Sequence, residues 1–240
     1  MTANVILLSN TSDIEKYGLT CRAINTLQST AHKGYSFNIV VVESNKAALD
    51  KGFLYPSSVA VVTPEEDFSY NKYLNHGLAY FEISDDLGNV PGEWTIVANN
   101  DVIFTDNWFN TMMEFHNAFP EYKSLCPFEP NWHPKRDLPG TEARSYVGYR
   151  TSYEIAGWCI AIHKDVIKQC DLFDERFDFW YQDNDYALTI EAAGIKHALV
   201  VDSRVYHDVS GSHDLLTDKN KHDMTDGQYK VLKSKWGDKI

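Results

Sequence analysis

The segment 94–101 has the sequence WTIVANND, in which a run of apolar and β-branched residues leads directly into two asparagines and an aspartate. Such a run is typical of a strand buried on both faces of a sheet. Three upstream segments have the same character: 5–8, 37–42 and 59–62. Between them, apolar residues recur at helical spacing over 20–31 and, after Ser69, which can cap a helix, as far as Phe81. This alternation predicts a doubly wound α/β fold, with a mixed, mainly parallel sheet flanked by helices.

The second half of the chain is less regular. Residues 126–150 hold four prolines and two glycines among polar residues, which predicts a functional loop rather than a linker. The segments that follow have clearer patterns: a strand at 157–162, a helix at 164–170, an acidic and aromatic stretch at 173–185, a helix at 183–193 and a strand at 198–201. No shift in composition marks a boundary, so we expect a single domain over 1–240.

The chain has 22 basic and 34 acidic side chains, which give a formal net charge of −12. An acidic surface disfavours nucleic acid as a partner, because binding the phosphate backbone needs clustered Lys and Arg. No apolar run approaches about 18 residues, so no transmembrane segment is expected. The N-terminus lacks a basic signal region, and the four cysteines form no CxxC pair. These features predict a reduced, cytoplasmic protein without a disulfide or zinc scaffold.

Two acidic residues follow predicted strands directly. Glu43 comes after the strand at 37–42, and Asp101 ends the segment 94–101. In open α/β sheets ligands collect at the carboxyl ends of the strands, so we expect a site at these two positions. A carboxylate at such a position can hold Mg²⁺ or Mn²⁺ together with substrate phosphate and water. An Asx-rich turn that merely ends a strand explains Asn99, Asn100 and Asp101 equally well.

Asp183 and Asp185 lie two positions apart at the predicted start of a helix. This spacing places them on different sides of the helix and favours separate roles, one of which is that of a general base. The alternative is the ordinary enrichment of acids at a helix N-terminus. Four aromatic residues precede them and indicate a lined cleft: Phe177, Phe179, Trp180 and Tyr181.

His207 follows the last predicted strand, and His213 lies close behind it. A neutral imidazole suits a borderline cation such as Mn²⁺. A hydrogen-bonded surface histidine is the alternative for any one of the nine histidines.

Taken in order, these features resemble family 2 glycosyltransferases of the GT-A fold, in particular the rhamnosyltransferase-like and galactosyltransferase-like inverting members. The resemblance covers nearly the whole chain and is carried by five stretches: Asn71 to Ala79, NNDV at 99–102, the block from GWC at 157–159 through FDERF at 173–177 to QDND at 182–185, Gly194, and KWG at 235–237. Gln182 stands where the family has Glu, Thr189 where it often has Arg, and Glu43 where Asp is commoner. These departures leave the choice of donor and acceptor open.

The resemblance implies a role for each matching residue. Asp183 would be the catalytic base, and Asp101 with His207 would hold Mn²⁺ or Mg²⁺. The donor would be bound by Glu43, Asn71, Asn99, Asn100 and Asp101. The acceptor would be bound by Trp158, Trp180, Tyr181 and Asp185. The chain would divide into a nucleotide-sugar half at 1–105, an acceptor half at 106–213 and a C-terminal helical tail at 214–240.

The implied activity is inverting transfer of a sugar from a nucleotide-diphospho-sugar (UDP-, dTDP- or GDP-linked) to a hydroxyl of a glycan, a lipid-linked molecule or another acceptor. The basic and aromatic residues of 126–150 keep a nucleic-acid acceptor open despite the net charge. Such an enzyme would work in the cytoplasm, at the membrane surface, or in a host cytoplasm if viral.

Two alternatives keep the same sheet. A sugar-1-phosphate nucleotidyltransferase needs a Gly-rich basic loop after the first strand, and the loop at 9–13 has neither Gly nor Arg. A non-catalytic module that binds a glycan and Ca²⁺ would bind sugars without turning over a donor.

Overall fold

The computed structural model describes residues 1–30, 34–86, 92–141, 143–208 and 218–240. The strands are β1 (Thr2–Ser9), β2 (Ser36–Glu43), β3 (Val59–Val62), β4 (Trp94–Asn99), β5 (Val102–Phe104), β6 (Tyr122–Phe128), β7 (Ser145–Val147), β8 (Cys159–His163) and β9 (Lys196–His207). The helices are α1 (Ile14–Ser29), α2 (Tyr70–Asp86), α3 (Trp108–Ala118), α4 (Lys164–Gln169), α5 (Gln182–Ala192) and α6 (Asp218–Trp236), with short 3-10 turns η1 (His133–Arg136) and η3 (Gly237–Lys239).

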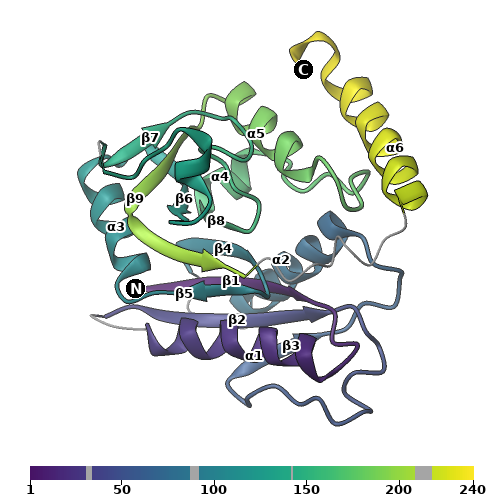
Figure 1. Cartoon of the computed structure of the whole chain (residues 1–240). Helices are drawn as coiled ribbons and strands as arrows, with labels where there is room; N and C mark the ends of the chain where they lie inside the picture. Colours follow the sequence, from purple (N-terminus) through teal and green to yellow (C-terminus); the bar gives the residue numbers. More distant parts are fainter. Residues whose placement is uncertain (31–33, 87–91, 142, 209–217) are drawn as a thin grey trace.

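The nine strands form one mixed sheet with the order β3-β2-β1-β4-β8-β6-β9-β5, and β7 pairs with β9 (Figure 1). Strands β3, β2, β1 and β4 are parallel to one another. β8 runs antiparallel to both β4 and β6, and β6 is parallel to β9. β5 and β7 run antiparallel to β9, so six of the nine strands point the same way. This confirms the predicted α/β fold with a mixed, mainly parallel sheet and flanking helices.

Alternation along β1 divides the interior into two cores. Val5 and Leu7 face a cluster that includes residues of α1 and α3. Ile6 and Leu8 face the opposite cluster, which includes residues of α2, α4 and α5. Gly77 of α2 is required at this second face, because a Cβ there would lie 2.6 Å from a methyl carbon of Ile6. The helix therefore packs close against the centre of the sheet.

Strand β9 is long enough to pair with strands in two parts of the sheet. Its first half pairs with β6 and β7, and its last three residues pair with β5. In this register Val102 is opposite His207, and the amide of Asp208 donates to the carbonyl of Asp101 at 3.0 Å. The carboxyl end of β4 and the end of β9 therefore meet at one place.

Several boundaries differ from the predicted ones. α1 begins at Ile14, six residues before the predicted start, because the Asp13 side chain caps it by accepting from the amide of Lys16 at 2.9 Å. Ser69 precedes α2 as predicted, but its hydroxyl makes no capping bond. The predicted loop at 126–150 contains the end of β6, η1 and β7. Strand β5 and helix α3 were not predicted.

Two predictions about the whole chain can also be compared with the structure. Among the described residues, no helix is both long and apolar enough to cross a bilayer. All four cysteines are free thiols: Cys21, Cys126, Cys159 and Cys170.

Candidate functional site

Asp101 and His207 are brought together by the pairing of β5 with β9. Nε2 of His207 lies 3.2 Å from Oδ1 of Asp101, and their side chains are 17% and 15% exposed. The described residues offer that buried Oδ1 no hydrogen bond. Neighbouring ligands of an octahedral ion with bonds of about 2.1 Å lie about 3 Å apart, so the pair fits two positions of a Mn²⁺ or Mg²⁺ shell.

The protein supplies few ligands at this point. Within the described ranges, no group of three or more His, Cys, Asp or Glu side chains is arranged to hold a metal ion. His213, the second candidate histidine, lies outside the described residues. A two-ligand site suits ions whose remaining positions are taken by water and substrate phosphate.

Trp158 supports the His207 imidazole. The two rings are stacked, with centroids 5.1 Å apart and an interplanar angle of 14°. Trp158 is 9% exposed, and its carbonyl accepts from the amide of Asn99 at 2.9 Å. The structure thus places this predicted acceptor residue behind the histidine, where it holds the ring in one orientation.

Asn99 and Asn100 are half-buried at the end of β4. Oδ1 of Asn99 accepts from the Tyr70 hydroxyl at 3.2 Å. Nδ2 of Asn100 donates to the Thr20 hydroxyl at 2.9 Å, which ties the turn to α1. The two side chains therefore hold the Asp101 turn between helices on opposite faces of the sheet.

Asp183 lies in the first turn of α5, half-buried. Its Oδ1 accepts from the amide of Asn184 at 2.9 Å. Burial raises the pKa of the Asp183 carboxyl above its usual range. A Cβ on Gly157 would lie 3.3 Å from Cβ of Asp183 and 3.6 Å from its Oδ2, so the missing side chain at Gly157 leaves the carboxylate its space.

Tyr70 was not predicted and lies between the two acidic positions. Its hydroxyl is 3.2 Å from Oδ1 of Asn99 and 3.3 Å from the carbonyl of Gly157, and it can donate to one of them at a time. Burial raises the pKa of this phenol, and the negative charges of Asp183 and Asp101 raise it further. No local pattern marks this tyrosine, because its neighbours on β4 and before β8 are distant in sequence.

Glu43 is fully buried at the end of β2. Its carboxylate accepts from the amides of Thr11 and Asn45 at 2.9 and 2.8 Å, and from the Tyr55 hydroxyl at 2.7 Å. These bonds order the loops that follow β1 and β2. Glu43 thus has its hydrogen-bonding capacity engaged within the protein, where it fixes the two loops at this edge of the sheet.

Asn71 is 1% exposed and belongs to the scaffold. Its Nδ2 donates to the carbonyl of Asp174 at 2.9 Å, and one turn later Asn75 donates to the carbonyl of Phe173 at 3.1 Å. The structure thus uses Asn71 to fasten α2 to the acidic segment that precedes α5, and we leave it out of the candidate donor contacts.

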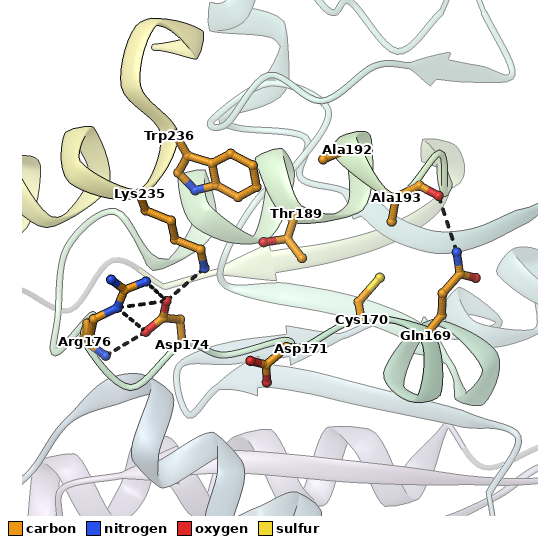
Figure 2. Close-up of a pocket in the computed structure, with 10 residues that line it drawn as sticks. All are labelled: Gln169, Cys170, Asp171, Asp174, Arg176, Thr189, Ala192, Ala193, Lys235 and Trp236. Carbon is orange, nitrogen blue, oxygen red and sulfur yellow. Dashed lines mark hydrogen bonds and ion pairs between the residues drawn. The ribbon is translucent and has the colours of Figure 1, made fainter.

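Asp185 faces the C-terminal helix, on the other side of α5 from the candidate base. It is 2% exposed, Nζ of Lys235 lies 2.9 Å from its carboxylate, and Nε1 of Trp236 donates to its Oδ1 at 2.7 Å. Lys235 also binds Asp174 at 2.9 Å (Figure 2). The Arg176 guanidinium and then Lys235 hold the pKa of Asp174 well below its usual range. Both oxygens of Asp185 are thus engaged inside the protein, and we leave it out of the candidate acceptor site.

Trp180 and Tyr181 lie directly before α5, both half-buried. Tyr181 adopts the left-handed conformation with φ of 61°, which is uncommon for a bulky residue. Its ring packs against Tyr229 of α6, with centroids 5.8 Å apart. An open pocket of about 460 Å³ is lined by residues of α4, the second half of α5, the acidic segment and the end of α6, and neither Trp180 nor Tyr181 lines it (Figure 2).

Comparison with known proteins gives likeness at the level of structure alone. The sequence matches no protein-family model and no curated protein. A crystal structure of GalNAc-T7 with UDP, GalNAc and Mn²⁺ is similar with a TM-score of 0.63 and 15% identity, over 86% of this chain and 43% of that one. Staphylococcus aureus TarS 1–349 in complex with UDP-GlcNAc gives a TM-score of 0.68 and 14% identity, over 100% and 68%. Another TarS 1–349 structure gives 0.59 and 14%, over 98% and 73%.

The chain thus spans less than half the length of the GalNAc-T7 structure and about two thirds of the TarS fragment. These neighbours are glycosyltransferases of the GT-A fold, and the likeness extends over most or all of this chain. The chain described here has the GT-A fold.

Proposed function

We propose that this protein is a metal-dependent glycosyltransferase that moves a sugar from a nucleotide-diphospho-sugar to an acceptor hydroxyl. The observation that carries the proposal is the pairing of Asp101 with His207 at the carboxyl end of β4, with a buried carboxylate oxygen to which none of the described residues donates a hydrogen bond. Tyr70 relates the candidate base to this pair, because its hydroxyl bonds to the carbonyl of Gly157, which packs beside Asp183, and the negative charges of Asp183 and Asp101 both raise its pKa.

In this proposal the donor side comprises residues 1–105 and the acceptor side residues 106–213. Asp101 and His207 hold Mn²⁺ or Mg²⁺, which when bound supplies positive charge to offset the charge of the leaving diphosphate. Asn99 and Asn100 lie beside the donor. Trp180 and Tyr181, directly before the base, lie beside the acceptor.

The chemical step uses Asp183. Because burial raises its pKa, this carboxylate accepts a proton more readily than an exposed aspartate does. It removes the proton from the acceptor hydroxyl, whose oxygen attacks the anomeric carbon opposite the diphosphate. The new C–O bond forms as the bond to the diphosphate breaks, so the configuration at that carbon inverts.

The neighbours support UDP-sugars as the first donors to test, because GalNAc-T7 was crystallised with UDP, GalNAc and Mn²⁺ and TarS with UDP-GlcNAc. At 14–15% identity they do not determine the donor of this chain, so dTDP- and GDP-sugars belong in the same panel.

Calorimetry of donor binding tests the proposal directly. We expect one of the nucleotide-sugars to bind in the presence of Mn²⁺ and to bind at least tenfold more weakly without it. Asp101→Ala should abolish the metal dependence, because it removes one of the two protein ligands, whereas Glu114→Gln, which changes an exposed acid of α3, should behave as wild type. Failure of every nucleotide-sugar to bind, with and without metal, would refute the proposal.

A further inference from the structure

The Arg136 guanidinium is held between aromatic rings without an acidic partner. Its central carbon lies 4.8 Å from the ring centroid of Trp132 and 5.7 Å from that of Tyr153. The side chain is half-buried, and among the described residues it makes neither a hydrogen bond nor an ion pair. Its five N–H donors are therefore directed away from any protein acceptor in that part of the chain.

The other arginines of the chain differ from it. Four of them have a carboxylate nearby: Arg22 with Asp208, Arg144 with Asp202, Arg150 with Glu154 and Arg176 with Asp174. The fifth, Arg204, is exposed to water. Within the described ranges, Arg136 is thus the arginine that is partly removed from water and has no carboxylate beside it. The two ring contacts limit the positions open to the guanidinium, so less freedom is lost when it binds a carboxylate or phosphate through two N–H groups.

Two indole rings lie in sequence between this guanidinium and the candidate metal ligands Asp101 and His207. Trp132 meets Trp158 edge to face, with centroids 5.6 Å apart, and Trp158 is stacked on His207. Trp132 is held in place by its Nε1, which donates to the carbonyl of Ser152 at 3.1 Å. The residue before Ser152 contacts α5, the helix that carries the candidate base, because Nδ2 of Asn184 donates to the Thr151 hydroxyl at 2.7 Å. Arg136 therefore belongs to the wall that flanks both Asp101–His207 and the start of α5.

We propose that Arg136 binds an anionic group, a phosphate or a carboxylate, carried by the acceptor glycan. The inference rests on the proposed function, which places the donor diphosphate at Asp101 and His207. Because Trp158 and Trp132 fill the space between that pair and Arg136, an anion at Arg136 is a different group from the donor diphosphate. The acceptor is thus a charged saccharide whose anionic substituent lies apart from the reacting hydroxyl.

The test is an NMR titration that follows the indole N–H resonance of Trp132, assigned with Trp132→Phe, in metal-free buffer. The probes are glucose, glucose 6-phosphate, glucuronate and inorganic phosphate. We expect glucose 6-phosphate or glucuronate to bind at least tenfold more tightly than glucose, and the tighter of the two identifies the anion.

Arg136→Gln should abolish this preference, and Arg136→Lys should retain only part of it, because an ammonium lacks the planar fork. The matched control is Arg204→Gln, which removes an exposed arginine of β9 and should bind as wild type does. The rest of the spectrum shows whether each variant is folded.

The inference is overturned if glucose binds as well as the charged sugars, or if folded Arg136→Gln keeps the preference. It is also overturned if inorganic phosphate alone binds as tightly as glucose 6-phosphate, or if a short oligothymidylate binds more tightly than any sugar. Metal-dependent binding of the nucleotide-sugar, measured on Arg136→Gln, should be unchanged. If wild type binds no nucleotide-sugar but keeps the anion preference, the proposed function fails and the anion site remains.

Discussion

The burial of the Asp183 carboxylate supports the role of general base that we propose for this residue. The residue lies at the start of a helix, where an exposed aspartate would be well solvated and fully ionised, but here it is half-buried beside Gly157 and burial raises the pKa of its carboxyl. The hydroxyl of Tyr70 bonds to Asn99 or Gly157, and the charges of Asp183 and Asp101 both raise the pKa of this phenol. The ionisation proposed for the site therefore depends on the burial of Asp183 and on the contacts of its individual neighbours.

The rate of sugar transfer should depend on the ionisation of Asp183. A base acts only when it is deprotonated, and burial raises the pKa of this carboxyl above 3.8. The value of kcat/KM should therefore fall as the pH is lowered, with a midpoint above that of an exposed aspartate. Asp183→Asn should lower the rate by a factor of about 10²–10⁴.

A pH profile measured between pH 4 and 8 with saturating metal checks this expectation. Binding of the nucleotide-sugar to Asp183→Asn serves as the control and should be nearly unchanged, because the side chain lies on the acceptor side. Wild-type turnover by this variant would show that another group is the base.

At the scale of elements, α6 and α5 are joined by a buried polar lock, defined by Lys235, Trp236, Asp174 and Asp185. The Lys235 ammonium and the Trp236 indole N–H both donate to the buried carboxylate of Asp185, and the ammonium also donates to Asp174. Asp185 lies on the same helix as Asp183, so the lock fixes the helix that carries the candidate base. This contact gives the KWG stretch a structural role.

Lys235→Met should destabilise the fold, because it leaves Asp185 charged and buried with only the Trp236 indole as a partner. Removing one member of a buried ion pair costs about 3 kcal/mol in unfolding free energy. The control is Lys233→Met, which changes an exposed lysine two residues earlier on the same helix. It should cost less than about 0.5 kcal/mol in unfolding free energy. Urea denaturation of the three proteins at pH 7 measures the difference, and equal midpoints for wild type and Lys235→Met would contradict the lock.

At the scale of the whole molecule, two buried histidines predict how stability depends on pH. Burial lowers the pKa of both His197 and His133 to about 4. His197 is fully buried, and its ring nitrogens lie 2.7 Å from the Ser124 hydroxyl and 3.0 Å from the carbonyl of Glu154. Each ring is neutral in the folded protein at pH 5, whereas an unfolded histidine with a pKa of about 6.5 is mostly protonated there.

The folded protein should therefore lose stability as the pH falls from about 6.5 to about 4, since the unfolded chain binds more protons across that window. The loss should be about 3 kcal/mol per histidine at the lower end. Guanidinium unfolding at pH 7.5, 6, 5 and 4.5 measures it, and His197→Gln should make the pH dependence shallower. An unfolding free energy that stays constant from pH 6.5 to 4.5 would show that neither histidine is held neutral by burial.

Much of the sheet was predictable, and much of the second half was not. Strands β1 and β4 and the second half of β2 are apolar runs because they are buried on both faces, and the edge strand β3 is a short β-branched run, so these signals are local. Strand β5 has three residues, and α3 begins after Asn107 in the left-handed conformation without a capping side chain, so neither element carries a clear local signal. The strand predicted at 198–201 covers only the continuously buried part of β9. Beyond Val201 exposed and buried residues alternate, and this second part of the strand was not predicted.

The sequence by itself determined the order of most strands and helices, and so placed Asp101 just after β4, His207 beyond the start of the last strand and Asp183 at the start of α5. Only the tertiary structure decided which of them meet. Asp101 faces His207 because β5 and β9 pair in one register, and Asp185 turns to Lys235 because α6 returns to α5. These partners lie far apart along the chain, and local patterns of burial and propensity contain no information about which distant groups share a space.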